Sequence, residues 1–275
     1  MIGRFILTIS LTGGVLFSSF QLKAGGFGLV SNIHALMIVL GGTLSVLLIA
    51  YNWRKIVWTI RLLRRAFGSR EDIDWTIRKI IDLARNYRKK WSIRLLEQEA
   101  NNLPRGLLRT GLELIAFNFP RDQIIHILRQ EALHTHEQYE MAYKMLRNLA
   151  RLAPAFGLAG TFVQLIRVLD NSPGPRDLLG PLAIAFLSAF YGLILAGLLF
   201  APLANKLKEF MEQSKLRMEI IQDGILALYD QEHPRAIRHK LEIRSSAMAL
   251  SNPFRIPPQV VLLAPGEQPV ENKIL

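Results

Sequence analysis

The sequence predicts an all-α integral membrane protein with four transmembrane helices, a helical cytoplasmic domain between the second and third, and a C-terminal cytoplasmic helix. Half of the 275 residues are apolar, one fifth are charged, and the formal net charge is +12. This composition indicates membrane spans joined to a basic soluble part. Several apolar stretches approach the length needed to cross a bilayer, because about 20 helical residues cover ~30 Å of hydrocarbon. Lys and Arg concentrate in segments 52–147 and 206–243, which predicts that these segments and both termini are cytoplasmic.

The first two spans are expected close to the N-terminus. Phe5–Phe20 is the first, and we expect it to be retained, because no convincing small-x-small cleavage site precedes the next apolar stretch. Ala35–Tyr51 is the second span. Trp53 and Trp58 follow it, where interfacial aromatic residues belong, and Lys55–Phe67 has the pattern of a basic amphipathic helix that lies along the membrane surface.

The soluble segment is predicted to be helical. One helix is expected from Glu71 to about Asn101, because apolar residues recur there at near-helical spacing, and Leu103-Pro104 ends it. A shorter helix covers Leu107–Phe117. The next begins at Pro120 and meets no helix breaker before Pro154. We therefore expect one long helix that leaves the cytoplasm and becomes the third span.

The third and fourth spans form a predicted hairpin within Asn148–Leu207, with the polar turn Asp170–Asp177 between two apolar segments. Polar groups at membrane depth face protein or water, because lipid cannot satisfy their hydrogen bonds. Two interpretations stay open for such groups here: they hold helices together, or they line an ion path. The polar residues concerned are Thr161, Gln164, Ser188 and Tyr191.

After the fourth span, an amphipathic helix is expected from Ala204 to about Glu232, and the proline-rich stretch from Ser251 is expected to be a disordered tail. The predicted segments are two spans, a cytoplasmic helical domain, two further spans, a C-terminal cytoplasmic helical segment and the tail. Their bounds are 1–52, 53–146, 147–205, 206–248 and 249–275.

Several classes of function are not expected. The chain has no cysteine, which excludes disulfides and thiolate metal sites. His134 and His136 are two residues apart, so on a helix they point in nearly opposite directions and cannot share a metal. We find no nucleophile–base set, phosphate-binding loop or metal cluster, so an enzyme and a metal site are not predicted. Membrane flanks account for the basic charge without nucleic acid.

Three stretches carry a resemblance to a known family. They are APAFGLAGTFVQLI in the third span, GPLAIAFLSAFYGLILAGLLFAPLANKLK in the fourth, and IIQDGILALYDQEHPRAIRHKL after it. In this order they resemble the MotA/PomA flagellar motor stator family, within the MotA/TolQ/ExbB proton channel superfamily. The resemblance extends from about Ala35 to Glu242. It implies a stator subunit in the bacterial inner membrane that converts ion flow into torque on the rotor.

The resemblance also implies partners. Family members form a homopentamer around a dimer of a MotB/PomB-type single-span protein and act on the rotor switch protein FliG. The partner carries the aspartate that binds the translocated ion, and no cofactor is implied. None of the spans of this chain contains a well-placed buried carboxylate of its own, which fits a subunit that supplies the walls of the channel.

Residues are carried over from the family one at a time. Pro154 and Pro202 match the family prolines at the cytoplasmic ends of the third and fourth spans, which implies a role in conformational coupling, although a simple helix-end proline is the alternative. Thr161 matches the threonine that faces the partner's carboxylate. Lys89 and Glu97 align best with the basic and acidic rotor-contact residues, and Arg88 and Lys90 compete with Lys89; a solvated helix face is the alternative for each.

The translocated ion is expected to be H+, with Na+ less favoured. Sodium-type members of the family carry two threonines where this chain has Ser188 and Ala189. A partly dehydrated sodium ion needs several oxygen ligands, and Ala189 supplies none. Gln164 and Arg167 also depart from the small residues that relatives usually have. The predicted ion path is thus Thr161, Ser188 and Ala189.

Three other readings stay open. An energiser resembling ExbB and TolQ usually has one span before its cytoplasmic domain, whereas this chain has two predicted spans there. A gliding or defence-system stator would share the four-span plan. A passive membrane scaffold would use the polar residues only for packing, and a carboxylate-bearing single-span partner encoded beside this chain would argue against it.

Overall fold

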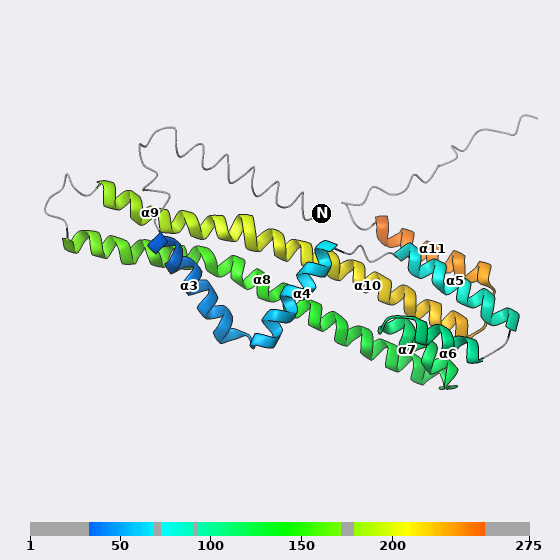
Figure 1. Cartoon of the computed structure of the whole chain (residues 1–275). Coiled ribbons are helices and arrows are strands. Elements are labelled where there is room, and N and C mark those ends of the chain that lie inside the picture. The colour runs from blue at the N-terminus through cyan, green and yellow to red at the C-terminus, as the bar shows by residue number, and fades with distance from the viewer. Residues whose placement is uncertain (1–32, 69–72, 91–92, 172–178, 251–275) are drawn as a thin grey trace, which may run out of the picture. The chain divides into compact units, whose positions relative to one another are not determined.

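The computed structural model describes residues 33–68, 73–90, 93–171 and 179–250 (Figure 1). No strand occurs in these ranges, which agrees with the predicted all-α fold. The predicted first span, Phe5–Phe20, and the predicted tail from Ser251 lie outside the described residues. The helices are α3 Ile33–Ala50, α4 Trp53–Gly68, α5 Ile73–Lys90, α6 Ile93–Asn102, α7 Leu107–Ala116, α8 Arg121–Asn171, α9 Leu179–Ile194, the π-helix η2 Leu195–Phe200, α10 Ala201–Tyr229 and α11 Pro234–Leu250.

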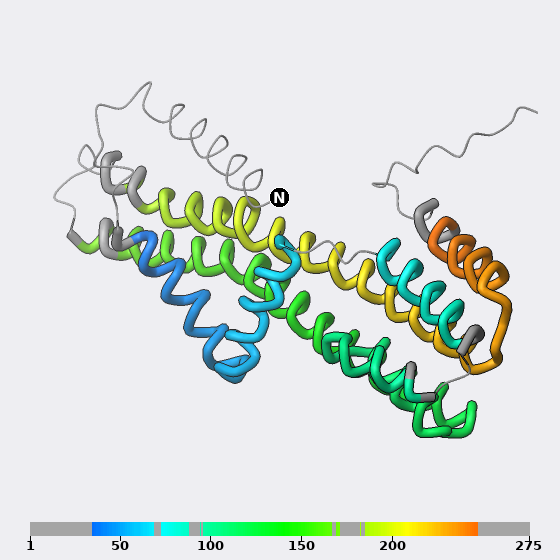
Figure 2. Tube along the Cα trace, turned by 45° about the vertical axis from the view of Figure 1, so that its right-hand side comes forward, coloured from blue at the N-terminus to red at the C-terminus, as the bar shows by residue number. Residues whose placement is uncertain are grey.

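Candidate membrane spans occur in three places along the described chain. Arg121–Ile166 and Ala185–Tyr229 are long and apolar enough to cross a bilayer. The pair α3 and α4 also qualifies when taken together, but it is bent by 112° after Ala50 (Figure 2). The second predicted span corresponds to α3, so α4 leaves the direction of that span instead of continuing it.

The chain divides into two compact units, each with its own core. The first contains residues 33–68 and 129–215 among those described, and the second contains 73–128 and 216–250. In the first unit, one face of α4 packs into a core with residues of α8 and α10, because its apolar side chains recur at helical spacing. This core consists of Leu47, Ile56, Leu62, Ala66, Ala142, Met145, Leu146, Leu149, Ala204, Leu207 and Phe210.

Aromatic side chains and one polar pair extend the core of the first unit. The ring of Tyr139 lies between Trp58 and Phe210, with centroid separations of 6.1 and 5.6 Å. Asn148 donates a hydrogen bond to the Tyr51 hydroxyl at 2.9 Å, which ties the end of α3 to α8. Since aromatic pairs at these separations attract beyond their buried area, they help to hold α4 against α8 and α10.

The second unit is a helical assembly around buried aliphatic side chains. Glycines allow α5 and α7 to approach α10: a methyl group at Gly111 would meet Ile225 at 2.6 Å, and one at Gly224 would meet Ile80 at 2.6 Å. The predicted apolar stripe of α5 is buried, as its spacing indicates. The fully buried large residues of this unit are Ile80, Leu83, Leu96, Leu112, Ile124, Leu128, Ile220, Ile225, Leu228, Ile237 and Leu241.

The single helix predicted from Glu71 to about Asn101 is wrong, because the structure has two helices, α5 and α6. Lys79 Nζ lies 2.7 Å from Glu99 Oε2. Twenty residues of one straight helix would separate these groups by ~30 Å, so the chain must fold back between them. The long helix predicted before Pro154 is confirmed by α8, which runs from Arg121 to Asn171 with Pro154 inside it.

Candidate functional site

Helices α8 and α9 touch through glycine backbones in the apolar hairpin. A methyl group at Gly157 would lie 3.0 Å from the Ser188 carbonyl oxygen and 3.1 Å from the Cα atoms of Ala189 and Gly192. One at Gly192 would lie 2.7 Å from the Ala153 carbonyl oxygen. Real Cβ atoms are essentially never found as close to backbone as 2.7 Å, so Gly192 needs glycine, and a side chain at Gly157 would be tight against the backbone of α9. Small residues of this kind let membrane helices approach closely.

Ser188 is the polar residue at the centre of this contact. Its side chain is fully buried, and its hydroxyl has no hydrogen-bond partner among the described residues. A side chain at Gly160 would overlap the Ser188 Oγ, so the absence of a side chain there makes room for the hydroxyl. An unpaired hydroxyl in apolar surroundings is costly. Ser188 is therefore placed to bond to something that enters the hairpin, such as water, an ion or a partner's polar group.

Two further polar side chains follow the same part of α8. Thr161 is half-buried and donates a hydrogen bond from Oγ1 to the Gly157 carbonyl oxygen at 3.1 Å. This leaves the lone pairs of its oxygen as acceptors. The amide nitrogen of Gln164, three residues further along α8, is buried without a partner in the described structure. Gln164, one of the polar residues that the sequence places in the spans, thus adds a second unsatisfied polar group.

Helix α3 closes one side of the hairpin. A methyl group at Gly160 would lie 3.1 Å from Ile38, and one at Gly42 would overlap the ring of Phe156. Thr43, which the sequence analysis did not single out, is fully buried and donates its hydroxyl to the Val39 carbonyl of its own helix. Its hydroxyl is therefore used within α3. In the sequence, the Gly41-Gly42 pair is the feature that indicates this close helix contact. Only Gly42 makes the contact, because Gly41 has open space around it.

The two prolines lie at different kinds of position. Pro154 is inside α8, where it supplies no N–H and its Cα would lie 3.2 Å from a methyl group at Gly192. Pro202 is the second residue of α10 and lies two residues after the π-helix η2 ends at Phe200; Ala201 between them caps η2 and donates its N–H to the Ala196 carbonyl. The wider π turn allows a proline at this point, because fewer α-type bonds depend on its missing N–H.

The structure brings Pro154, Ser188 and Ala189 together around Gly157 and Gly192. Ala189 is half-buried and supplies no side-chain oxygen. Lys89 and Glu97 lie in the other unit and on different helices, α5 and α6. Glu97 is exposed, whereas for Lys89 only the backbone is described. In the described ranges no group of three His, Cys, Asp or Glu side chains could hold a metal ion.

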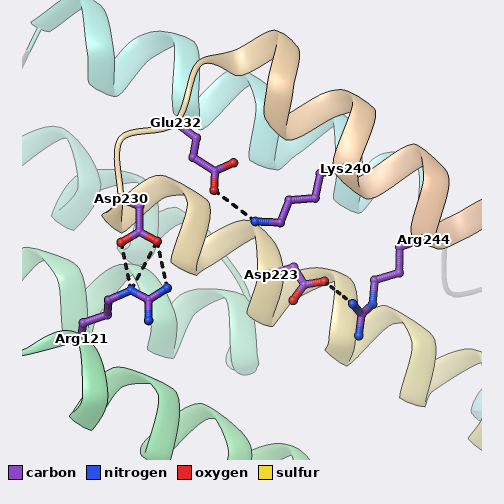
Figure 3. A network of polar contacts seen from close by, with 6 residues as sticks. All are labelled: Arg121, Asp223, Asp230, Glu232, Lys240 and Arg244. Atoms are coloured by element: carbon purple, nitrogen blue, oxygen red, sulfur yellow. Dashed lines mark hydrogen bonds and ion pairs between the residues drawn. The ribbon is translucent and has the colours of Figure 1, made fainter.

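Ion pairs join α8, α10 and α11 in the second unit (Figure 3). Arg121 donates from Nε and Nη2 to the Asp230 carboxylate at 3.0 Å each. The hydrogen bond from Arg121 and its charge hold the pKa of Asp230 below its usual range. Arg244 reaches Asp223 at 2.9 Å and Lys240 reaches Glu232 at 3.1 Å, which fastens α11 to the end of α10 and the turn after it.

Comparison with known proteins gives a consistent result. Residues 99–220 match the model of the MotA/TolQ/ExbB proton channel family. The chain is 29% identical over 231 residues to the chemotaxis protein PomA of Vibrio alginolyticus, covering 83% of this chain and 90% of that protein. It is 26% identical over 235 residues to motility protein A of Treponema pallidum, covering 85% and 90%.

Solved structures show the same fold. The C. jejuni MotAB structure matches with a TM-score of 0.80 at 20% identity, covering 89% of this chain and 96% of that chain. The flagellar MotAB stator complex from Bacillus subtilis matches with a TM-score of 0.77 at 23% identity, covering 91% and 96%. These structures show the fold, and the sequence matches agree with the resemblance that the three stretches of the sequence carry.

Proposed function

We propose that this chain is a member of the MotA/TolQ/ExbB proton channel family, that it is the stator subunit of a flagellar motor, and that it forms part of the motor's ion channel. The observation that carries the proposal is the unpartnered Ser188 hydroxyl, held against Gly160 inside an otherwise apolar helix pair. A scaffold that only packs helices gains nothing from a buried, unsatisfied hydroxyl, whereas an ion path uses it as a ligand or a water anchor.

In this proposal the path is lined by Thr161 and Ser188, and Ala189 marks the place of a missing hydroxyl. The oxygen of Thr161 keeps free lone pairs because its proton is used by the Gly157 carbonyl. Protons can move through water that such oxygens hold, while a dehydrated sodium ion needs more oxygen ligands than this pair offers. The ion is therefore H+ rather than Na+.

The carrier of the ion is a partner's carboxylate, since this chain has no acidic residue within the described hairpin helices between Asn148 and Leu169 or between Leu179 and Leu207. The solved structures that share its fold are MotAB structures. By analogy, this chain surrounds a dimer of a MotB/PomB-type single-span protein as a homopentamer in the bacterial inner membrane, with both termini cytoplasmic. The basic segments outside the spans support this orientation.

Coupling of ion flow to motion is assigned to Pro154 and Pro202. Pro154 lies in the turn of α8 that touches Gly192, so a change at Ser188, one turn away on α9, reaches it through direct backbone contact. Torque then passes to the rotor switch protein FliG through surface charges of the second unit, for which Lys89 and Glu97 are our candidates. Glu97 is exposed, as such a contact requires.

The test is the swimming speed of cells that depend on this chain and its partner. Speed is followed while potassium replaces sodium at fixed pH and then after a protonophore is added. We expect motility to survive the loss of sodium and to stop with the protonophore. Ser188→Ala and Thr161→Ala should slow swimming, while Ser214→Ala, which removes a buried hydroxyl of α10 outside the hairpin, should not.

Two outcomes would contradict the proposal. Loss of motility on sodium removal would show that Ala189 does not exclude a sodium path. Normal swimming by both Ser188→Ala and Thr161→Ala, at wild-type protein levels, would show that these hydroxyls only pack helices. The scaffold reading would then replace the ion path.

A further inference from the structure

Helix α4 carries a row of arginines on its outer face. Arg54, Arg61 and Arg65 follow each other at i, i+7 and i+11, so they share one side of the helix, and all three are exposed. The row is ~16 Å long at the rise of an α-helix. Helix α4 contains no acidic residue. Within the described part of the chain, none of the three guanidinium groups has an ion-pair partner.

An apolar row lies beside the arginines on the same helix. Trp53, Val57 and Ile60 follow at i, i+4 and i+7, and Trp53 and Ile60 are 66% and 53% exposed. A basic row next to an apolar row is the arrangement of a helix that lies in a membrane interface, with its apolar side at the acyl boundary. Tryptophan is also enriched at that depth.

The opposite face of α4 fixes its position along the hairpin. Ile56 and Leu62 share a core with Ala142–Leu149 of α8, directly before the third span, and with Ala204–Phe210 of α10, directly after the fourth. Helix α4 therefore packs at the end of the hairpin where both spans meet their basic flanks. The 112° bend after α3 turns it away from the direction of that span, so it can lie along the surface of the bilayer.

We propose that the outer face of α4 binds anionic phospholipid headgroups, with Arg54, Arg61 and Arg65 on the phosphates and Trp53 and Ile60 at the acyl boundary. Guanidinium groups bind phosphate oxygens in a bidentate manner. Three of them without a local carboxylate create a positive field that favours lipids of net negative charge over zwitterionic ones. The inference rests on the membrane arrangement of the proposed function, but on neither the ion nor the rotor.

The test uses the full chain in phosphatidylcholine vesicles that contain a trace of spin-labelled phosphatidylglycerol or spin-labelled phosphatidylcholine. Electron paramagnetic resonance then measures the fraction of each labelled lipid that the protein immobilises. We expect the wild-type chain to immobilise phosphatidylglycerol about threefold or more above phosphatidylcholine, with the excess falling as salt is added.

Three variants separate the arginine row from net charge. Arg54→Gln/Arg61→Gln/Arg65→Gln should bring the ratio close to one. The triple variant Arg129→Gln/Arg235→Gln/Arg238→Gln removes the same charge from exposed positions of α8 and α11 and should keep the wild-type ratio. Arg54→Lys/Arg61→Lys/Arg65→Lys should keep part of the preference, because charge remains but the bidentate contact is lost.

If the wild-type chain immobilised phosphatidylglycerol and phosphatidylcholine equally, the proposal would be overturned. The outer face of α4 would then be a site for another protein instead of a lipid. An unchanged ratio in the glutamine variant of the row would overturn the proposal as well. Neither result bears on the ion path, because the measurement needs no partner, ion gradient or rotor. Conversely, if the motility test failed while the lipid preference was intact, the proposed motor function would be refuted and the lipid site on α4 would still be supported.

Discussion

Ser188 fills the space that a side chain at residue 160 would occupy, so the glycine on α8 and the serine on α9 depend on each other. The hydroxyl is buried and unpartnered only because Gly160 leaves room for it. Packing and polarity in this part of the hairpin are therefore set by one pair of residues. This relationship can be tested without any assay of function.

Gly160→Ala should destabilise the chain by about 1–3 kcal/mol, the usual cost of overpacking a closely packed site. Adding Ser188→Ala removes the overlapping oxygen and should recover most of that loss, giving a favourable coupling energy in a double-mutant cycle. The free energy of unfolding in detergent, from chemical denaturation, provides the measurement. Simple additivity of the two substitutions would show that Ser188 does not occupy this space.

Gly192→Ala should cost more than Gly160→Ala, because its methyl group would meet the backbone of α8 at Ala153 and Gly157 instead of a side-chain tip. We expect a loss at or above about 3 kcal/mol. Gly197→Ala is the matched control, since nothing lies within 4 Å of a methyl group there. The control should be neutral or stabilising by up to about 1 kcal/mol, from helix propensity. Equal losses of unfolding free energy for Gly192→Ala and Gly197→Ala would refute the backbone contact at Gly192.

Pro154→Ala should stabilise α8 and slow the motor. The alanine N–H can bond to the Ala150 carbonyl, which restores the bond that an interior proline removes at a cost of about 3 kcal/mol. We expect a higher unfolding midpoint together with reduced swimming speed. Pro234→Ala is the control, because Pro234 is the first residue of α11, where proline fits a helix. Unchanged swimming by Pro154→Ala would remove this proline from the coupling.

The Arg121–Asp230 pair should make the second unit sensitive to acid. The pKa of Asp230 is lowered in the folded state, mainly by the hydrogen bond from Arg121. Its contribution to stability is therefore present above the ordinary aspartate pKa and is lost as pH falls through the lower, folded value. Because the pair is exposed, the effect is small. Asp230→Asn should lower the unfolding temperature slightly near pH 7, and the difference from wild type should shrink as pH falls below the ordinary aspartate pKa.

Salt provides a check on that last prediction. The difference between wild type and Asp230→Asn near pH 7 should shrink as ionic strength rises, because salt screens exposed charges. Asp82→Asn is a useful comparison, since Asp82 has only a loose 3.6 Å contact with Arg85 on the same helix. If the difference in unfolding temperature between wild type and Asp230→Asn persisted at a pH below the pKa of Asp230, it would have to come from packing instead of charge.

Local sequence patterns predicted most of the helices correctly. The apolar spacing of Ile73, Ile77 and Ile80 marked the buried face of α5, and the absence of a breaker before Pro154 marked the length of α8. The break between α5 and α6 was missed, because no proline or glycine separates them and a helical reading continues across it. What reveals the break is the tertiary ion pair of Lys79 with Glu99, which no local pattern encodes.

The candidate site was only partly readable from sequence. Thr161 and Ser188 could be found because polar residues are conspicuous in apolar spans. Their environment could not, since it depends on which glycines face which helix: Gly160 faces Ser188, Gly42 faces Phe156, and Gly41 faces open space. The sequence alone does not distinguish these three glycines from one another. Only the packing of three helices distinguishes them.

The π-helix η2 has a consequence for the phase of the fourth apolar helix. A π turn holds roughly one residue more than an α turn, so it rotates everything after it by about 100° relative to an uninterrupted α-helix. Ser188 and Leu207 are 19 residues apart, so in an uninterrupted α-helix their side chains would point about 100° apart. The offset at Leu195–Phe200 cancels this difference, so the polar contact at Ser188 and the apolar contact at Leu207 lie on the same side of the helix. The π turn thus lets both contacts face α8.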